Sequence, residues 1–145
     1  MPGKSNYLED LLLNGMLRNT GLLAQSGSVY VGLKTADPTD DNSGGTEPTI
    51  GTNAYARVAV SRATGSWGAP ADASGAQRTS NTGTITFPTS TGAWASGAAL
   101  THFIVMDAAT AGNMLWSGAL QNSRVVDATG ITVSFAASAL TIEES

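Results

Sequence analysis

The residues that could support hydrolysis are few. A hydrolytic triad needs a nucleophile, a base and an acid that orients the base, and this 145-residue chain has one histidine, His102. His102 and Asp107 could supply the base and the acid. No Gly-x-Ser-x-Gly pattern stands between an expected strand and an expected helix, where it would present the serine. Because His102 lies in a strongly apolar run, we expect a structural imidazole with one hydrogen bond and no catalytic residues.

Three acids close together, Asp37, Asp40 and Asp41, could offer oxygen ligands to a hard cation such as Ca²⁺. Their spacing does not match the EF-hand loop, which needs acids at alternating positions, a central glycine and a terminal glutamate. A solvated turn that starts at Asp37 explains them more simply. The chain also has no cysteine, which removes thiolate metal sites and disulfides. We therefore expect no metal and no cofactor.

Protein contacts are better supported than catalysis. Trp67 and Trp94 lie among glycines in expected loops, where a large ring either pins the loop to its own domain or anchors it to a neighbour. Both interpretations stay open. Arg57 and Arg62 flank an alternating strand, and arginine tolerates burial in an interface while pairing with carboxylates. These four side chains are candidate contact residues.

The first of the elements that must position these residues is a helix over residues 7–18. Asn6, three residues before a glutamate, fits a capping box. Leu8, Leu12 and Met16 recur at helical spacing and form one apolar stripe. A short helix of this kind needs a surface to lie on, which is either its own sheet or a partner. The stripe is therefore a further set of candidate contact residues.

From residue 28 onward the apolar residues alternate with a period of two, which is typical of half-buried strands. About eight short strands are expected, at 29–34, 55–60, 85–87, 100–106, 113–117, 124–126, 131–135 and 140–142. Turn residues at 107–112 and 127–130 predict two hairpins. The fold class is therefore all-β: an antiparallel β-sandwich of jelly-roll type with one N-terminal helix.

The whole chain, 1–145, reads as one domain, with an N-terminal helical arm at 1–27 and the sandwich at 28–145. Two connections, 37–53 and 65–82, are longer than compact domains usually keep without a function. We expect both to be contact arms. The prolines, glycines and acids of 37–53 further predict a segment that cannot bury itself and becomes ordered only against a neighbour.

The amino-acid composition limits the classes of partner that the protein is expected to bind. Seven Lys and Arg against eleven Asp and Glu give a net charge of −4, which disfavours nucleic acid and anionic membranes. No apolar run reaches the length of a membrane helix, and the first residues do not resemble a secretory signal. With only 12% charged residues, the surface is neutral and rich in Thr, Ser and Ala. Such a surface favours contacts with proteins.

The order and spacing of many short motifs resemble a family of small tailed-bacteriophage virion proteins, which includes proteins labelled tail fibre and is similar to some head cement (decoration) proteins. The motifs are YLEDLL at 7–12, VYVGLKTADPTD at 29–40, GGTE at 44–47, AYARV at 54–58, ITFP at 85–88, THF at 101–103, DAATAGNML at 107–115, GAL at 118–120 and FAASALTI at 135–142. The chain departs from the family at 65–78, which is longer here.

The resemblance implies a β-sandwich without enzymatic activity, made in the host bacterial cytoplasm and incorporated into the virion. Because the chain lacks the repeats and coiled-coil heptads of a fibre shaft, we expect a head cement protein. Its partners would be the major capsid protein of a phage and further copies of itself, as a homo-oligomer. The alternative is a tail fibre or baseplate component, with or without a receptor- or glycan-binding role, and a lone-domain enzyme is the least supported class.

Overall fold

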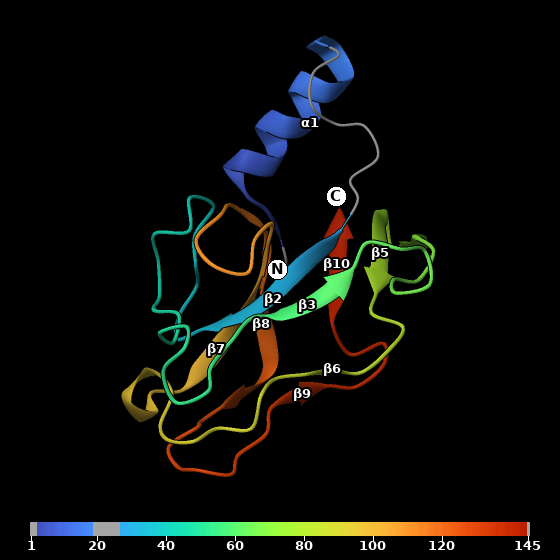
Figure 1. Cartoon of the computed structure of the whole chain (residues 1–145). Helices are drawn as coiled ribbons and strands as arrows, with labels where there is room; N and C mark the ends of the chain where they lie inside the picture. The colour runs from blue at the N-terminus through green and yellow to red at the C-terminus, as the bar shows by residue number, and fades with distance from the viewer. Residues whose placement is uncertain (1–2, 19–26, 145) are drawn as a thin grey trace.

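The computed structural model describes residues 3–18 and 27–144, with the side chains of 14–16 left out (Figure 1). Helix α1 spans Asn6–Arg18, and a short 3₁₀ helix, η1, spans Ala95–Gly97. The strands are β1 (Gly3–Lys4), β2 (Ser28–Lys34), β3 (Val58–Ser61), β4 (Ala71–Ala73), β5 (Ala76–Ser80), β6 (Ile85–Thr86), β7 (Leu100–Met106), β8 (Met114–Arg124), β9 (Ser134–Phe135) and β10 (Thr141–Glu144). Neither helix in this part of the chain has the length and apolar character needed to cross a bilayer.

The strands form three antiparallel sheets. The largest has the order β1-β8-β7-β2-β3, a second has the order β10-β5-β4, and β6 pairs with β9. The expected all-β class with antiparallel sheets is thus confirmed, and the described residues hold ten strands rather than eight. These sheets of five, three and two strands do not confirm the jelly-roll arrangement.

The core lies where the large sheet meets the two smaller ones. Along β2, Val29, Val31 and Leu33 alternate onto this side and are buried together with Ile142 of β10. The opposite face of the large sheet holds a smaller cluster that includes Ile104. Both faces of the central strands are therefore covered, which explains why the end of β7 is apolar on both sides.

Helix α1 is fixed at its N-terminal end. Ser5 Oγ accepts a hydrogen bond from the backbone N–H of Leu8 at 3.3 Å, so the capping side chain belongs to Ser5 and not to Asn6. The Ser5 hydroxyl also donates to the carbonyl of Met114 at the start of β8. Beyond Leu8, which is buried in the core, the helix extends past the end of the sheets (Figure 1). Residues 19–26, the remainder of the expected 1–27 arm, lie outside the described residues.

One of the two expected hairpins is present. Strands β7 and β8 are joined by a turn in which the N–H of Asp107 donates to the carbonyl of Asn113 at 3.0 Å. The hairpin expected from 124–126 and 131–135 is wrong, since β9 pairs with β6. The backbone carbonyl of Val126 instead accepts a hydrogen bond from Trp94 at 2.8 Å. Burial of Val126 beside Trp94 takes the place of the local pairing.

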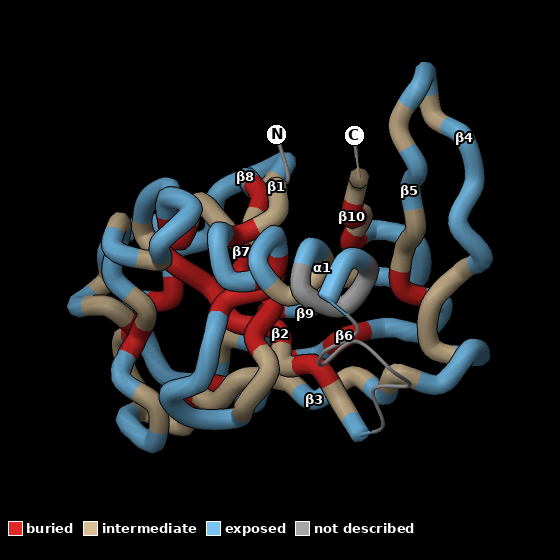
Figure 2. Tube along the Cα trace, turned by 90° about the horizontal axis from the view of Figure 1, so that it is seen from above, coloured by how far each residue is buried: buried red, intermediate tan, exposed pale blue. Residues whose placement is uncertain are grey.

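The segment 65–82, expected as a long loop, contains the hairpin of β4 and β5, which reaches out from the body of the domain (Figure 2). Its two turn residues, Ser74 and Gly75, both have positive φ, as the tightest hairpin turns require. Strand β5 also pairs along its length with β10. The small residues of this hairpin show no apolar alternation, so the sequence pattern did not reveal it.

Trp94 belongs to an aromatic cluster in the core. Its ring lies 5.1 Å from that of Tyr55 and 6.3 Å from that of Phe87, and only 1% of the residue is exposed. Its Nε1 donates to the carbonyl of Asn53 at 2.9 Å. Trp94 therefore pins the loops of its own domain, which is the first of the two interpretations that the sequence left open, and its role as a contact residue stays a prediction.

We predict that Trp94→Ala lowers the free energy of unfolding by about 3–5 kcal/mol, because it leaves a large cavity between Tyr55 and Phe87. Chemical denaturation followed by circular dichroism measures the change. Val125→Ala, at a side chain that is 48% exposed, is the control and should stay within about 0.5 kcal/mol of the original chain. A loss below about 1 kcal/mol for the tryptophan variant would contradict the assignment.

Candidate functional site

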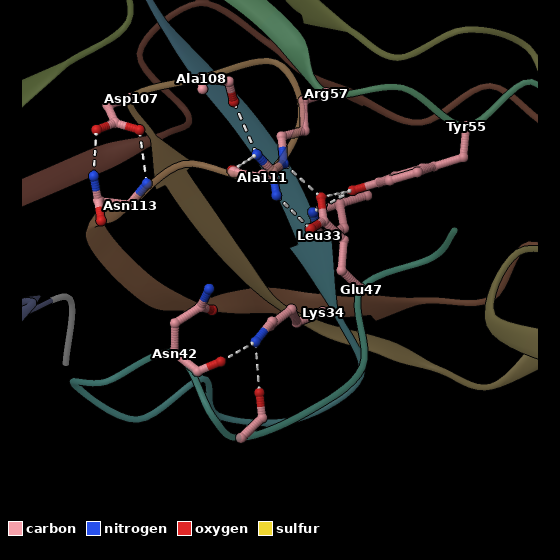
Figure 3. Close-up of polar contacts among 11 residues, drawn as sticks. Leu33, Lys34, Asn42, Glu47, Tyr55, Arg57, Asp107, Ala108, Ala111 and Asn113 are labelled. Atoms are coloured by element: carbon pink, nitrogen blue, oxygen red, sulfur yellow. Dashed lines mark hydrogen bonds and ion pairs between the residues drawn. The ribbon is translucent and has the colours of Figure 1, made fainter. Parts of the chain in front are cut away.

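A buried ion pair fastens the loop after β2 to its surroundings (Figure 3). Arg57 Nε and Nη2 each donate to one oxygen of the Glu47 carboxylate at 2.8 Å. Arg57 Nη1 donates to the carbonyls of Ala108 and Ala111, also at 2.8 Å. The Arg57 side chain is 5% exposed and is used within its own chain. It therefore supports the fold of its own chain, and its role as a contact residue stays a prediction.

Tyr55 links this ion pair to β2. Its hydroxyl donates to Glu47 Oε1 at 3.0 Å and accepts from the backbone N–H of Leu33 at 3.0 Å. Burial and the adjacent Glu47 charge raise the pKa of Tyr55 far above its ordinary value, so the hydroxyl stays neutral. A side chain at Gly32 would bring its Cβ within 2.8 Å of Glu47 Oε1, so the close approach of the loop requires glycine there.

Lys34, at the end of β2, closes the next part of the loop. Its Nζ donates to the carbonyls of Asn42 at 2.9 Å and Gly44 at 2.7 Å. Burial lowers the pKa of Lys34, and the charge of Glu47 partly offsets this effect. Lys34 and Pro38 are both buried. Lys34 and the ion pair therefore tie segment 37–53 to the sheet, although most of its residues are exposed, and its ordering against a neighbour stays a prediction.

Two of the three acids considered as cation ligands, Asp37 and Asp41, use their carboxylates in the turn of this loop. Asp37 Oδ1 accepts from the N–H of Thr39 at 3.0 Å, and Asp41 Oδ1 accepts from the hydroxyls of Thr39 at 2.6 Å and Ser43 at 2.7 Å. The backbone carbonyl of Asp40 accepts from the N–H of Asn6. Within residues 3–18 and 27–144, no group of three or more His, Cys, Asp or Glu side chains could hold a metal ion.

His102 and Asp107 are not joined into a catalytic pair. His102 Nδ1 lies 2.9 Å from the hydroxyl of Thr101. Both carboxylate oxygens of Asp107 are occupied by Asn113, Oδ1 by its backbone N–H at 2.7 Å and Oδ2 by its amide at 2.9 Å. Asp107 therefore closes its own turn and does not orient the imidazole.

The best candidate for a functional site is an apolar groove beside α1, with a volume of about 550 Å³. One wall is the inner side of α1, and the other is formed by β5, β10 and the segment after β3; Figure 2 shows α1 lying beside these strands. Four of the seven candidate contact residues, Leu8, Leu12, Arg62 and Trp67, line this groove. The sequence analysis thus identified residues from both walls.

Apolar groups dominate the lining. Leu11, Leu12, Trp67 and Trp116 pack against the core but remain partly exposed. Lining residues that the sequence analysis did not select include Tyr7, Leu11, Val29, Pro70, Trp116 and Ile142. They come from five separate segments, so only the tertiary structure assembles them. Met16 lies in α1, but its side chain is outside the described part of the structure.

The rim of the groove is polar. Lys4 Nζ lies 2.7 Å from Glu144 Oε2, and Trp116 Nε1 donates to Glu144 Oε1. On the β5 side, Arg78 pairs with Glu143 while its side chain stays 49% exposed. An apolar groove with a polar rim is typical of an interaction site. A second, more polar hollow of about 630 Å³, lined largely by Thr, Ala and Asn, lies beside η1.

Comparison with known proteins gives the family. Residues 3–143 match the family model described as Podophage GP4 fiber I protein gp80. The chain belongs to this family. A search of the curated proteins found no match.

Membership of the Podophage GP4 fiber I protein gp80 family confirms the resemblance to phage virion structural proteins. The family is described as a fibre and not as a head protein, so it supports our alternative of a tail fibre component better than the head cement role.

We predict that Glu47→Gln lowers the free energy of unfolding by about 3–5 kcal/mol, because it leaves the Arg57 guanidinium buried without a counter-charge. Thermal and denaturant unfolding measure the loss. Glu143→Gln removes the partner of the half-exposed Arg78 and serves as the control, with an expected loss below about 1 kcal/mol. Equal losses for the two variants would refute a special role for the buried pair.

We predict that Asp41 titrates at about pH 2 in the folded protein, because the hydroxyls of Thr39 and Ser43 stabilise its carboxylate and lower its pKa from 3.8 to about 2. Its contribution to stability is present above about pH 4 and is lost as the pH falls through about 2. Carboxyl ¹³C NMR measures the midpoint. Thr39→Ala should raise the midpoint towards the ordinary value, and an unchanged midpoint would contradict the contact.

Proposed function

We propose that this protein is a structural component of a phage tail fibre. The observation that carries the proposal is the family match, which covers residues 3–143 and is described as a fibre protein. The coarser statement, that the chain belongs to a family of phage virion structural proteins, already follows from that match.

The geometry of the domain suits a building block. Arg57, Glu47 and Lys34 hold the long loop against the sheet, so the loop is positioned by side chains of its own chain. The groove beside α1 offers an apolar surface to a neighbouring protein. Copies arranged on a symmetric virion repeat each contact, so modest single interfaces are sufficient for firm attachment.

The proposal replaces the head cement role as our preferred function. In a fibre, the partners would be other tail proteins and further copies of this chain, in place of the major capsid protein. A receptor- or glycan-binding role stays a prediction, and the polar hollow beside η1 is the place to look for it because its threonine hydroxyls and Asn53 can hydrogen-bond a neutral ligand.

We predict that virions separated into heads and tails carry this protein in the tail fraction, where antibodies against it label the fibres in electron micrographs. Phage lacking the protein should assemble heads of normal heat stability, because the protein is absent from the shell. Protein found with the heads, together with heads that rupture at a lower temperature in its absence, would overturn the fibre assignment and restore the cement role.

A further inference from the structure

Helix α1 carries a second apolar stripe that its own domain does not cover. Leu13 is 59% exposed and Leu17 is 79% exposed. The two are four residues apart, so they lie on the same side of the helix. At 3.6 residues per turn, this side is roughly half a turn away from Leu8 and Leu12, which line the groove. The helix is therefore apolar on two opposite sides.

One chain thus contains both an apolar groove and an exposed leucine stripe, but the stripe cannot pack into the groove of the same chain. Leu13 and Leu17 are on the side of α1 that faces away from the groove, and the wall next to that groove is the same helix. We propose that Leu13 and Leu17 of one copy pack into the groove of a second copy of this chain. This goes beyond the fibre role, because it states how copies join wherever in the virion they lie.

The charges around the two surfaces fit each other. Glu9 and Asp10 are exposed and stand four and three residues before Leu13, so they flank the stripe on both sides. On the far wall of the groove are Arg62 and Arg78, and Arg78 remains half exposed although it pairs with Glu143. The stripe thus brings carboxylates towards a wall that carries two arginines.

The two acids of the groove already have partners within the chain. Asp107 accepts two hydrogen bonds from Asn113. Glu144 pairs with Lys4 and accepts from Trp116. Glu144 is therefore paired within the chain, as Arg78 is with Glu143, whereas the hydrogen bonds from Asn113 satisfy the oxygens of Asp107 without neutralising its charge.

The contact joins two different surfaces, so each copy can donate its stripe to one neighbour and accept the stripe of another. Such an interface forms a reciprocal pair, a closed ring or an open filament, according to the rotation between copies. Burying two leucines and the groove lining supplies the apolar centre that specific interfaces have.

The first test measures the mass of the purified full chain in solution by light scattering over a range of concentrations. We expect the original chain to form a dimer or larger oligomer, and the double variant Leu13→Gln/Leu17→Gln to associate at least about tenfold more weakly. Val125→Gln changes another exposed apolar residue, away from both surfaces, and should associate like the original chain. Circular dichroism checks that each variant folds.

The second test separates the two halves of the contact. Gln77 is exposed on β5 and lines the groove, so Gln77→Trp should fill the groove and also weaken association. Mixing Gln77→Trp, whose leucine stripe is intact, with Leu13→Gln/Leu17→Gln, whose groove is intact, should give a mixed oligomer. A monomeric original chain, unchanged association of the leucine variant, or no mixed oligomer would each overturn the proposal.

A monomer would leave the groove to a different virion protein. None of these measurements depends on where the protein lies in the virion, so failure of this inference and failure of the fibre assignment are distinguishable.

Discussion

The ion pair between Arg57 and Glu47 is the interaction on which the shape of this domain depends most. Its free energy of desolvation is offset by two hydrogen bonds to the Glu47 carboxylate and by two more from Nη1 to the carbonyls of Ala108 and Ala111. A single side chain therefore fixes the loop after β2, the start of β3 and the turn between β7 and β8. Segments without regular structure thereby gain a defined position, which strand pairing alone would not give them.

This internal fastening divides the molecule into two kinds of surface. Around Arg57 and Lys34, most polar groups are satisfied within the chain, although Asn42 Oδ1 is buried without a hydrogen-bond partner among the described residues. Beside α1 the reverse holds, because the helix is anchored at Ser5 and Leu8 but its later turns extend past the sheets. Apolar side chains of the helix, together with Trp67 and Trp116 in the groove, consequently stay partly exposed. The same chain thus has one region held by internal hydrogen bonds and another with exposed apolar side chains.

Local sequence patterns predicted the elements whose signals are local. The alternation around Val31 and the apolar run ending at Met106 gave β2 and β7 nearly to the residue. The β4–β5 hairpin was missed because the small and polar residues of β5 do not alternate with large apolar ones. The pairing of β9 with β6 was missed because it joins segments about fifty residues apart. Trp94 and Trp67 both have glycines near them in the sequence. Trp94 is buried because it packs against Tyr55, which is distant in the sequence, whereas Trp67 lines the groove.

The amino-acid composition could not distinguish a head role from a tail role, because it carries no information on how distant segments pack. A chain with 12% charged residues and a net charge of −4 has little electrostatic repulsion between copies, and this holds for a shell protein and for a fibre protein alike. What differs between those roles is the shape of the surface that contacts neighbouring proteins. A flat lattice favours contacts spread over a broad face, whereas this domain concentrates its uncovered apolar side chains along one projecting helix and the groove next to it. In the contact proposed above, this helix and groove join one copy to the next through a small, directional surface and not through a broad face.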